Sequence, residues 1–158
     1  MITLLNPLAE TMIPVQAGEA LKQGMWVTET GYNATSGEVE VEKVDSDSIA
    51  KYDRDKIFLV LSYPIDIAGD EDTYETIAHD AMCIRTGNYA GLQVEDDALV
   101  ANSTTTNWGL TAFGTDMVLN TNGFLTETGK ADAGSGRTVV AKFLRCVNDI
   151  VFYETVVA

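Results

Sequence analysis

The chain has 158 residues and a mass of 17.1 kDa, the size of one domain that is long enough to bury a core. Hydrophobic residues make up 46% and charged residues 22%, an ordinary globular composition that argues against wholesale disorder. Acids outnumber bases 24 to 10, and the net charge of -14 repels the phosphate backbone of nucleic acids. We therefore expect no nucleic-acid partner.

The N-terminal segment predicts neither export nor membrane insertion. It lacks the basic stretch and the long apolar stretch of a signal peptide. No apolar run in the sequence approaches the roughly 18 residues that a membrane helix needs. We therefore expect synthesis in a cytoplasm and no membrane partner.

Residues 1–14 are predicted to form an extended arm, and residues 15–158 a single β-rich domain. The arm contains Pro7 and Pro14 and shows little periodicity. It is also strongly apolar, so we expect it to pack on its own domain or on a neighbouring subunit. Its candidate contact residues are Ile2, Leu4, Leu5, Leu8, Met12 and Ile13.

The first half of the domain predicts several short strands. Residues 25–28 form one, and another is expected to begin at residue 31. Residues 38–44 predict a strand with one wet and one dry face, because acidic and apolar side chains alternate from Glu38 to Glu42. Residues 56–63 form a continuous apolar run that ends before Pro64, which is typical of a buried strand.

The middle of the chain is harder to interpret. Residues 45–55 are polar and could hold a helical turn, and residues 69–72 predict an acidic loop. Residues 72–82 fit either a helix or two short strands that divide at His79 and Asp80. We favour strands, because the surrounding segments are strand-like.

The last third predicts strands over residues 116–120, 123–126, 138–145 and 150–157. Asn148 and Asp149 indicate a turn, which makes residues 138–157 a hairpin. Many short strands separated by 13 glycines predict an all-β fold, a compact sandwich or small barrel of short antiparallel strands with an extended N-terminal arm.

Charge is distributed unevenly along the chain. Residues 66–97 contain nine acids and one base, which predicts solvated acidic loops. Residues 110–158 contain five acids and four bases. A partner surface is therefore expected in this nearly neutral part.

The sequence predicts no catalytic, cofactor or metal site, and we do not expect an enzyme. The single histidine, His79, has no nucleophile motif beside it. The acidic loops that begin at Asp45 and Asp70 lack the glycine and the final acid of a calcium-binding loop. Cys83 and Cys146 lie in apolar strand-like contexts that favour buried free thiols, while a disulfide between them stays open.

Two stretches resemble tailed-bacteriophage capsid decoration (cement) proteins. The first, IPVQAGEALKQGMWV at residues 13–27, follows an apolar arm with a Gly-acid-x-apolar-x-x-Gly-x-x-Val segment. The second combines FGTDMVLN at residues 113–120, GFL at 123–125 and GRTVVAKF at 136–143, followed by a terminal strand. The likeness covers about half of the chain and consists of glycine placements and strand lengths, while residues 45–100 are longer and more acidic than the family pattern.

The resemblance implies a structural protein on the outer surface of an icosahedral phage head, where it would cement neighbouring major capsid subunits against DNA pressure. The implied partners are the major capsid protein and further copies of the chain, as a homotrimer or alternatively a homodimer. Trp26, Trp108 and the hairpin at 138–157 are candidate oligomer contacts, because aromatic residues are enriched at interface centres. The alternative is a carbohydrate-binding or adhesion β-sandwich on a virion or tail surface, with the same two tryptophans in its binding face.

Overall fold

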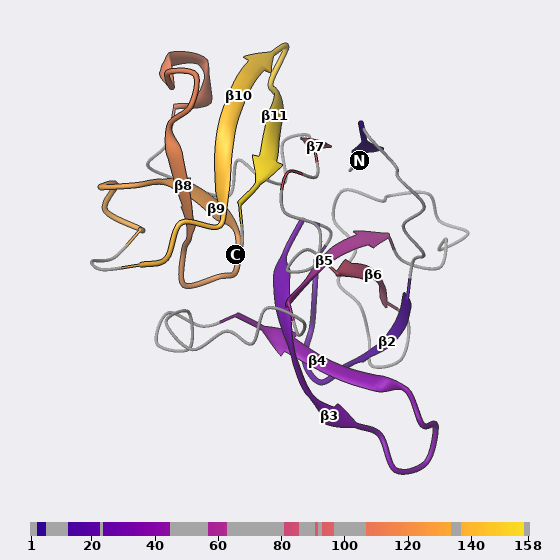
Figure 1. Ribbon diagram of the computed structural model, residues 1–158. Coiled ribbons are helices and arrows are strands. Elements are labelled where there is room, and N and C mark those ends of the chain that lie inside the picture. The colour runs from indigo at the N-terminus through magenta and orange to yellow at the C-terminus, as the bar shows by residue number, and fades with distance from the viewer. Residues whose placement is uncertain are drawn as a thin grey trace.

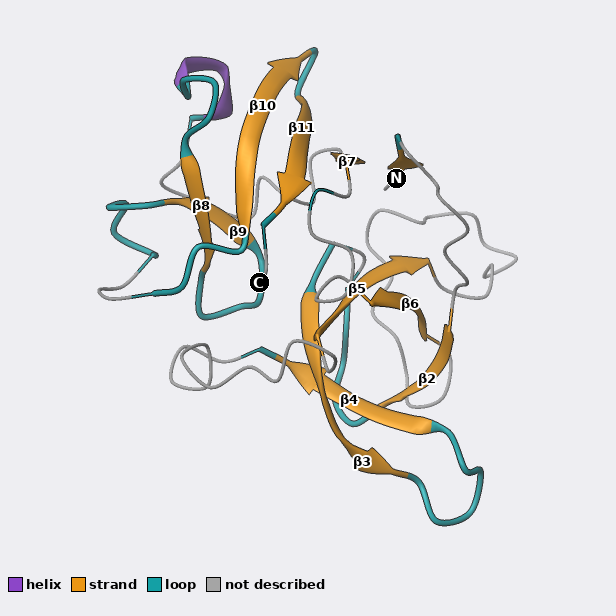
Figure 2. Ribbon diagram, viewed as in Figure 1, coloured by secondary structure: helices purple, strands orange, loops and turns teal. Residues whose placement is uncertain are grey.

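The computed structural model describes residues 3–5, 13–22, 24–44, 57–62, 81–85, 91, 93–96, 107–133 and 137–156. Within these residues the secondary structure is β-strand, apart from the short 3-10 helix η4 (Trp108–Leu110) (Figure 2). The all-β prediction is therefore confirmed. The predicted helical turn at 45–55, the acidic loop at 69–72 and residues 72–80 lie outside the described residues.

Five strands close into a barrel in the order β2-β4-β3-β5-β6 (Figure 1). The strands are β2 (Ile13–Ala17), β3 (Trp26–Tyr32), β4 (Val39–Lys43), β5 (Ile57–Ser62) and β6 (Ala81–Arg85). Among the described pairs, β2 and β4 alone run parallel, and the others are antiparallel. Closure pairs both edges of every strand in the barrel.

Strand β4 shows the predicted alternation. Val39 and Val41 are buried, whereas Glu42 is exposed and Glu40 is half-buried. Strand β3 differs from the prediction, because residues 26–32 form one strand instead of two. A bulge between Glu29 and Gly31 shifts the register, so the chain bends at Gly31 without leaving the sheet.

The remaining strands form a six-stranded sheet in the order β1-β7-β11-β10-β8-β9. They are β1 (Thr3–Leu4), β7 (Gln93–Asp96), β8 (Asp116–Leu119), β9 (Leu125–Glu127), β10 (Ala141–Val147) and β11 (Ile150–Thr155). The predicted hairpin is confirmed as β10 and β11, although β10 begins at residue 141. Its turn residues Asn148 (φ 51°) and Asp149 (φ 65°) both lie in the left-handed region, as a type I′ turn requires.

The N-terminal segment takes part in both sheets. Thr3 and Leu4 pair with β7, and the Leu5 N–H donates to the Gln93 carbonyl oxygen at 2.9 Å. Strand β2 begins at Ile13, so the predicted boundary after residue 14 falls inside a strand that pairs with both β4 and β6. The described arm residues therefore pair within their own chain.

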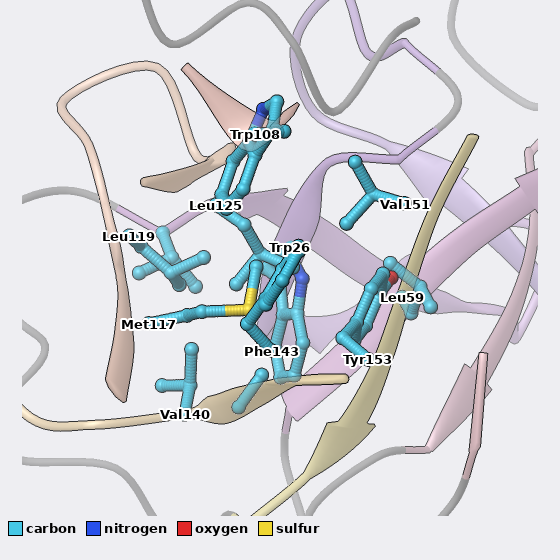
Figure 3. Close-up of a cluster of buried hydrophobic side chains, with 12 residues drawn as sticks. Trp26, Leu59, Trp108, Met117, Leu119, Leu125, Val140, Phe143, Val151 and Tyr153 are labelled. Carbon is cyan, nitrogen blue, oxygen red and sulfur yellow. The ribbon is translucent and has the colours of Figure 1, made fainter. Parts of the chain in front are cut away.

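The two sheets exchange aromatic side chains. Trp26 of the barrel belongs to the core cluster of the six-stranded sheet, where Figure 3 shows it amid Leu125, Phe143 and Tyr153. In the opposite direction, Phe124 joins the barrel core. Each core is thus completed by an aromatic residue from the other half.

Candidate interaction surface

The two tryptophans predicted as interface anchors lie in the interior. Trp26 is 0% exposed and Trp108 is 6% exposed. The indole N–H groups of both residues have no hydrogen-bond partner within the part of the chain that the structure describes. Neither ring is presented to a partner, and neither offers a stacking platform to a sugar.

The predicted contact residues of the arm do not form one described patch. Leu4 lies in β1, Ile13 lies in β2, and Leu5 is 40% exposed. Ile2, Leu8 and Met12 lie outside the described residues. What the described arm offers is main-chain pairing, since β1 is an edge strand of the six-stranded sheet.

Two large hydrophobic side chains are exposed in the segment before β8. Leu110 is 83% exposed at the end of η4, and Phe113 is 81% exposed in the loop that follows. We call Leu110 and Phe113 the apolar tip. Figure 1 shows η4 and the β10–β11 turn at the same, upper end of the molecule, and η4 contacts β10. Exposed apolar side chains close together in a chain are a candidate for an interaction surface.

The loop that carries the apolar tip is held firmly on the sheet. The Trp108 ring stacks on Phe143, with 5.9 Å between centroids and 15° between planes. The Gly114 N–H donates to the Phe143 carbonyl oxygen at 2.8 Å, and the Phe143 N–H donates to the Thr115 carbonyl oxygen at 2.9 Å. The buried Trp108 side chain therefore helps to position the loop that exposes Leu110.

Turns within the loop fix the outward direction of Leu110 and Phe113. The Leu110 N–H donates to the Asn107 carbonyl oxygen at 2.9 Å, closing η4. The Thr115 hydroxyl donates to the Ala112 carbonyl oxygen at 2.6 Å on the far side of Phe113. A surface presented in one conformation loses little entropy when it binds.

The sequence did not single out Leu110 as a contact, although it carried a signal. Residues 98–115 contain no charged side chain, in a chain that is 22% charged. The apolar tip also falls within the nearly neutral region where a partner surface was predicted. Sequence patterns indicate where charge is missing, but they do not separate a buried apolar residue such as Trp108 from an exposed one such as Leu110.

The opposite part of the molecule is acidic. Strand β4 carries Glu40 and Glu42, and Glu38 immediately precedes it. Lys43 contacts Glu19 through its ammonium group at 3.8 Å and donates its backbone N–H to Glu19 Oε1 at 2.8 Å. The barrel therefore presents a negative face, while the apolar tip is uncharged.

Cys146 is a free thiol, half-buried and packed against the core of the six-stranded sheet. Burial raises the pKa of the Cys146 thiol, and the nearby Asp149 carboxylate raises it further, against a smaller opposing effect of a backbone hydrogen bond at Asp149. The thiol is consequently a poor nucleophile at neutral pH.

Within the described ranges no three His, Cys, Asp or Glu side chains gather in a way that could hold a metal ion. His79 and the acidic loops at Asp45 and Asp70 lie outside those ranges. The same ranges contain no helix that is both long and apolar enough to cross a membrane.

Comparison with protein-family models, curated proteins and solved structures found no match for this chain.

Proposed function

We propose that the chain is a structural virion protein that binds the outer surface of an icosahedral phage head. There it cements neighbouring major capsid subunits against the pressure of packaged DNA. It works through buried contact area and without catalysis, and it acts as an oligomer, a homotrimer in the first instance. It is made in the host cytoplasm and resides on the capsid exterior.

The observation that carries this proposal is the contact between the two stretches that resemble decoration proteins. The Trp26 N–H of the first stretch donates to the Gly123 carbonyl oxygen of the second at 2.9 Å. Trp26 also packs among Met117 and Phe143 from the second stretch. Two segments about 90 residues apart in sequence therefore contact each other in the fold. Their contact supports interpreting the two resemblances as parts of one family pattern.

The distribution of charge supports an exterior position. A protein with a net charge of -14 is repelled by the DNA inside a head and stays soluble on the outside. The uncharged apolar tip supplies a surface that can be covered without desolvating charge. A molecule with these two properties is suited to hold other proteins together.

Strand β1 supports a means of attachment. It is two residues long and is held to β7 by main-chain pairing at the end of the sheet. Main-chain pairing does not depend on particular side chains, so the same segment can add to an exposed strand of a capsid subunit. Each such contact can be weak, because an oligomer docks several arms at once.

The proposal is tested by co-sedimentation with expanded empty heads assembled from the major capsid protein of the same genome. We expect saturable binding with a fixed ratio of chains to capsid subunits. An unrelated acidic protein of similar net charge is the control for non-specific trapping. Absence of binding at any ratio would overturn the proposal.

A further inference from the structure

The barrel and the six-stranded sheet contain the same arrangement of five strands. From β2 the barrel has the order β2-β6-β5-β3-β4, and from β7 the sheet has the order β7-β11-β10-β8-β9. Each barrel strand thus has a counterpart in the sheet, in the same chain order, and all of these pairings are antiparallel in both halves. The halves differ in closure. In the barrel β2 also pairs with β4, whereas its counterpart β7 pairs at its other edge with β1.

Hydrogen bonds and a bulge recur at equivalent positions of the two halves. The Gly24 N–H donates to the Val60 carbonyl oxygen at 3.0 Å, and the Val60 N–H donates at 3.0 Å to the carbonyl oxygen of the residue after the glycine. Gly114 and Phe143 form the same two bonds, at 2.8 Å and 2.9 Å. A β-bulge follows Val60 in the β5–β6 pair and Phe143 in the β10–β11 pair. Because bulges are specific features of a fold, this agreement indicates one unit that is present twice.

This register makes Asp116 the counterpart of Trp26, and Lys142 the counterpart of Leu59. Trp26 pairs with Leu59 across β3 and β5, and Asp116 pairs with Lys142 across β8 and β10. Each pair lies next to the pair that the glycine bonds define. The third strand of each half agrees as well. The carbonyl oxygens of Trp26 and Asp116 accept, at 3.0 Å and 3.1 Å, the N–H of the residue that follows β4 and β9, respectively.

Trp26 and Leu59 lie on the outer face of the barrel and inside the sheet. Both side chains are 0% exposed and belong to the core cluster of the six-stranded sheet, where Figure 3 shows them. Their neighbours Val27 and Val60 belong to the core of the barrel. Because successive side chains of a strand point to opposite faces, Trp26 and Leu59 project out of the barrel. They cover the inner face of the second half from outside.

The counterpart residues lie at the surface. Asp116 and Lys142 form an ion pair with 2.9 Å between Oδ1 and Nζ, and their side chains are 47% and 44% exposed. An ion pair as exposed as this one adds little to stability. The second half therefore forms its strand pairs without an apolar pair at this outer position. By equivalence, Trp26 and Leu59 serve the contact between the halves and not the barrel itself.

We infer that the chain is a tandem pair of one five-stranded unit, in which the closed first unit, β2–β6, docks its outer face into the open second unit, β7–β11. A closed barrel encloses a core of its own, so the first unit keeps its fold in water when it is undocked. Undocking withdraws Phe124 from that core, which weakens the barrel, so it does not outlast the second unit in urea. The second unit depends on Trp26 and Leu59 to cover its core. This inference does not rest on the proposed function.

The test is amide hydrogen exchange of the full chain, measured by mass spectrometry, in two double variants on the same two strands. The outer-face variant, Trp26→Asp with Leu59→Lys, introduces the ion pair of the second unit. We expect the amides of β8–β11 to exchange at least about tenfold faster, while those of β3 and β4 stay protected. The inner-face variant, Val27→Asp with Val60→Lys, places the same charges in the barrel core. We expect it to accelerate exchange in both units.

Asp116→Asn with Lys142→Gln is the matched control at the equivalent positions, and we expect it to leave exchange in both units unchanged. Leu59→Lys alone is a milder undocking variant with the same expectation as the outer-face variant. Loss of protection in β3 and β4 of both undocking variants, as in the inner-face variant, would overturn the inference, because Leu59 would then support the barrel itself. Full protection of β8–β11 in the outer-face variant would also overturn it, because the second unit would not need the docked barrel.

Discussion

The backbone N–H of Trp26 donates a hydrogen bond to the carbonyl oxygen of Gly123, with 2.9 Å between nitrogen and oxygen. This bond joins the first residue of β3 to the turn between β8 and β9. Beside it the side chains cross over, so that Trp26 fills the core of the six-stranded sheet and Phe124 fills the core of the barrel. We therefore expect the barrel and the sheet to behave as one cooperative unit.

This contact predicts a special requirement for glycine at position 123. Gly123 has a φ of +80°, and a Cβ atom there would lie 3.1 Å from the Trp26 carbonyl oxygen. Gly129 has a similar φ of +87° but open space around it. In both Gly→Ala variants the alanine must adopt the left-handed backbone conformation, which costs about 1–2 kcal/mol. Only Gly123→Ala must also displace the β3 backbone.

We therefore expect Gly123→Ala to lower the free energy of unfolding by at least about 1 kcal/mol more than Gly129→Ala. Urea denaturation followed by circular dichroism measures both losses. Equal losses would mean that the close approach of Gly123 to Trp26 does not constrain the fold.

The exchange of aromatic residues predicts that the two halves unfold together. Phe124→Ala removes a buried ring from the barrel core and is expected to cost about 3–5 kcal/mol. Phe124 lies between two strands of the six-stranded sheet in sequence. We therefore expect the variant to lose stability in the barrel and in the sheet together, in a single unfolding transition. Coincident urea curves from tryptophan fluorescence and far-UV circular dichroism would establish this. Two separate transitions in the unmodified chain would contradict a single unit.

The position of β2 predicts where the arm can be removed safely. Deleting residues 1–11 takes away β1 but keeps Ile13, where β2 begins and closes the barrel. We expect this truncation to remain folded, since it removes pairing at only two register positions, and to lose binding to heads. A deletion that continues to residue 17 is the contrasting variant and should unfold the barrel. Normal binding of the shorter truncation would exclude the arm as the attachment.

The environment of Cys146 predicts its reactivity with pH. Burial, followed by the charge on Asp149, raises the pKa of the thiol. The Cys146 thiol therefore keeps its proton to a higher pH in the folded state than in the unfolded state. Its contribution to the free energy of unfolding is complete below the pKa of the unfolded state and declines as the pH rises towards the pKa of the folded state.

We expect a thiol reagent to modify Cys146 slowly at neutral pH, and more rapidly as the thiolate forms at alkaline pH. Cys83→Ser isolates the signal of Cys146 in this measurement. Asp149→Asn should shift the midpoint of the rate profile to lower pH, because it removes a negative charge that opposes ionisation of the Cys146 thiol. Asparagine is the chosen replacement because it tolerates the left-handed backbone conformation of residue 149. An unchanged midpoint would contradict the assigned influence of Asp149.

Local patterns in the sequence predicted local structure well. The alternation around Val39 and Val41 identified β4 and its buried face, and the Asn148–Asp149 pair located the β10–β11 turn. Long-range relationships could not be obtained in this way. The parallel pairing of β2 with β4 and the pairing of β1 with β7 join segments whose individual patterns do not specify a partner.

For the candidate surface, too, the sequence indicated a region of the chain but not the exposed residues within it. A nearly neutral C-terminal region was predicted to hold the partner surface, and the apolar tip lies there. The choice of Trp26 and Trp108 relied on the frequency of aromatic residues at interfaces, but large rings suit a core equally well. The fold decides between the two, because the stacking of Trp108 on Phe143 buries one aromatic residue and leaves Phe113 outside.

The proposed role in holding a shell together can be measured as the temperature at which DNA-filled heads release their DNA. Heads that lack the chain should release DNA at a lower temperature than native heads, and addition of the purified chain should restore the native value. Equal release temperatures with and without the bound chain would contradict the proposed role.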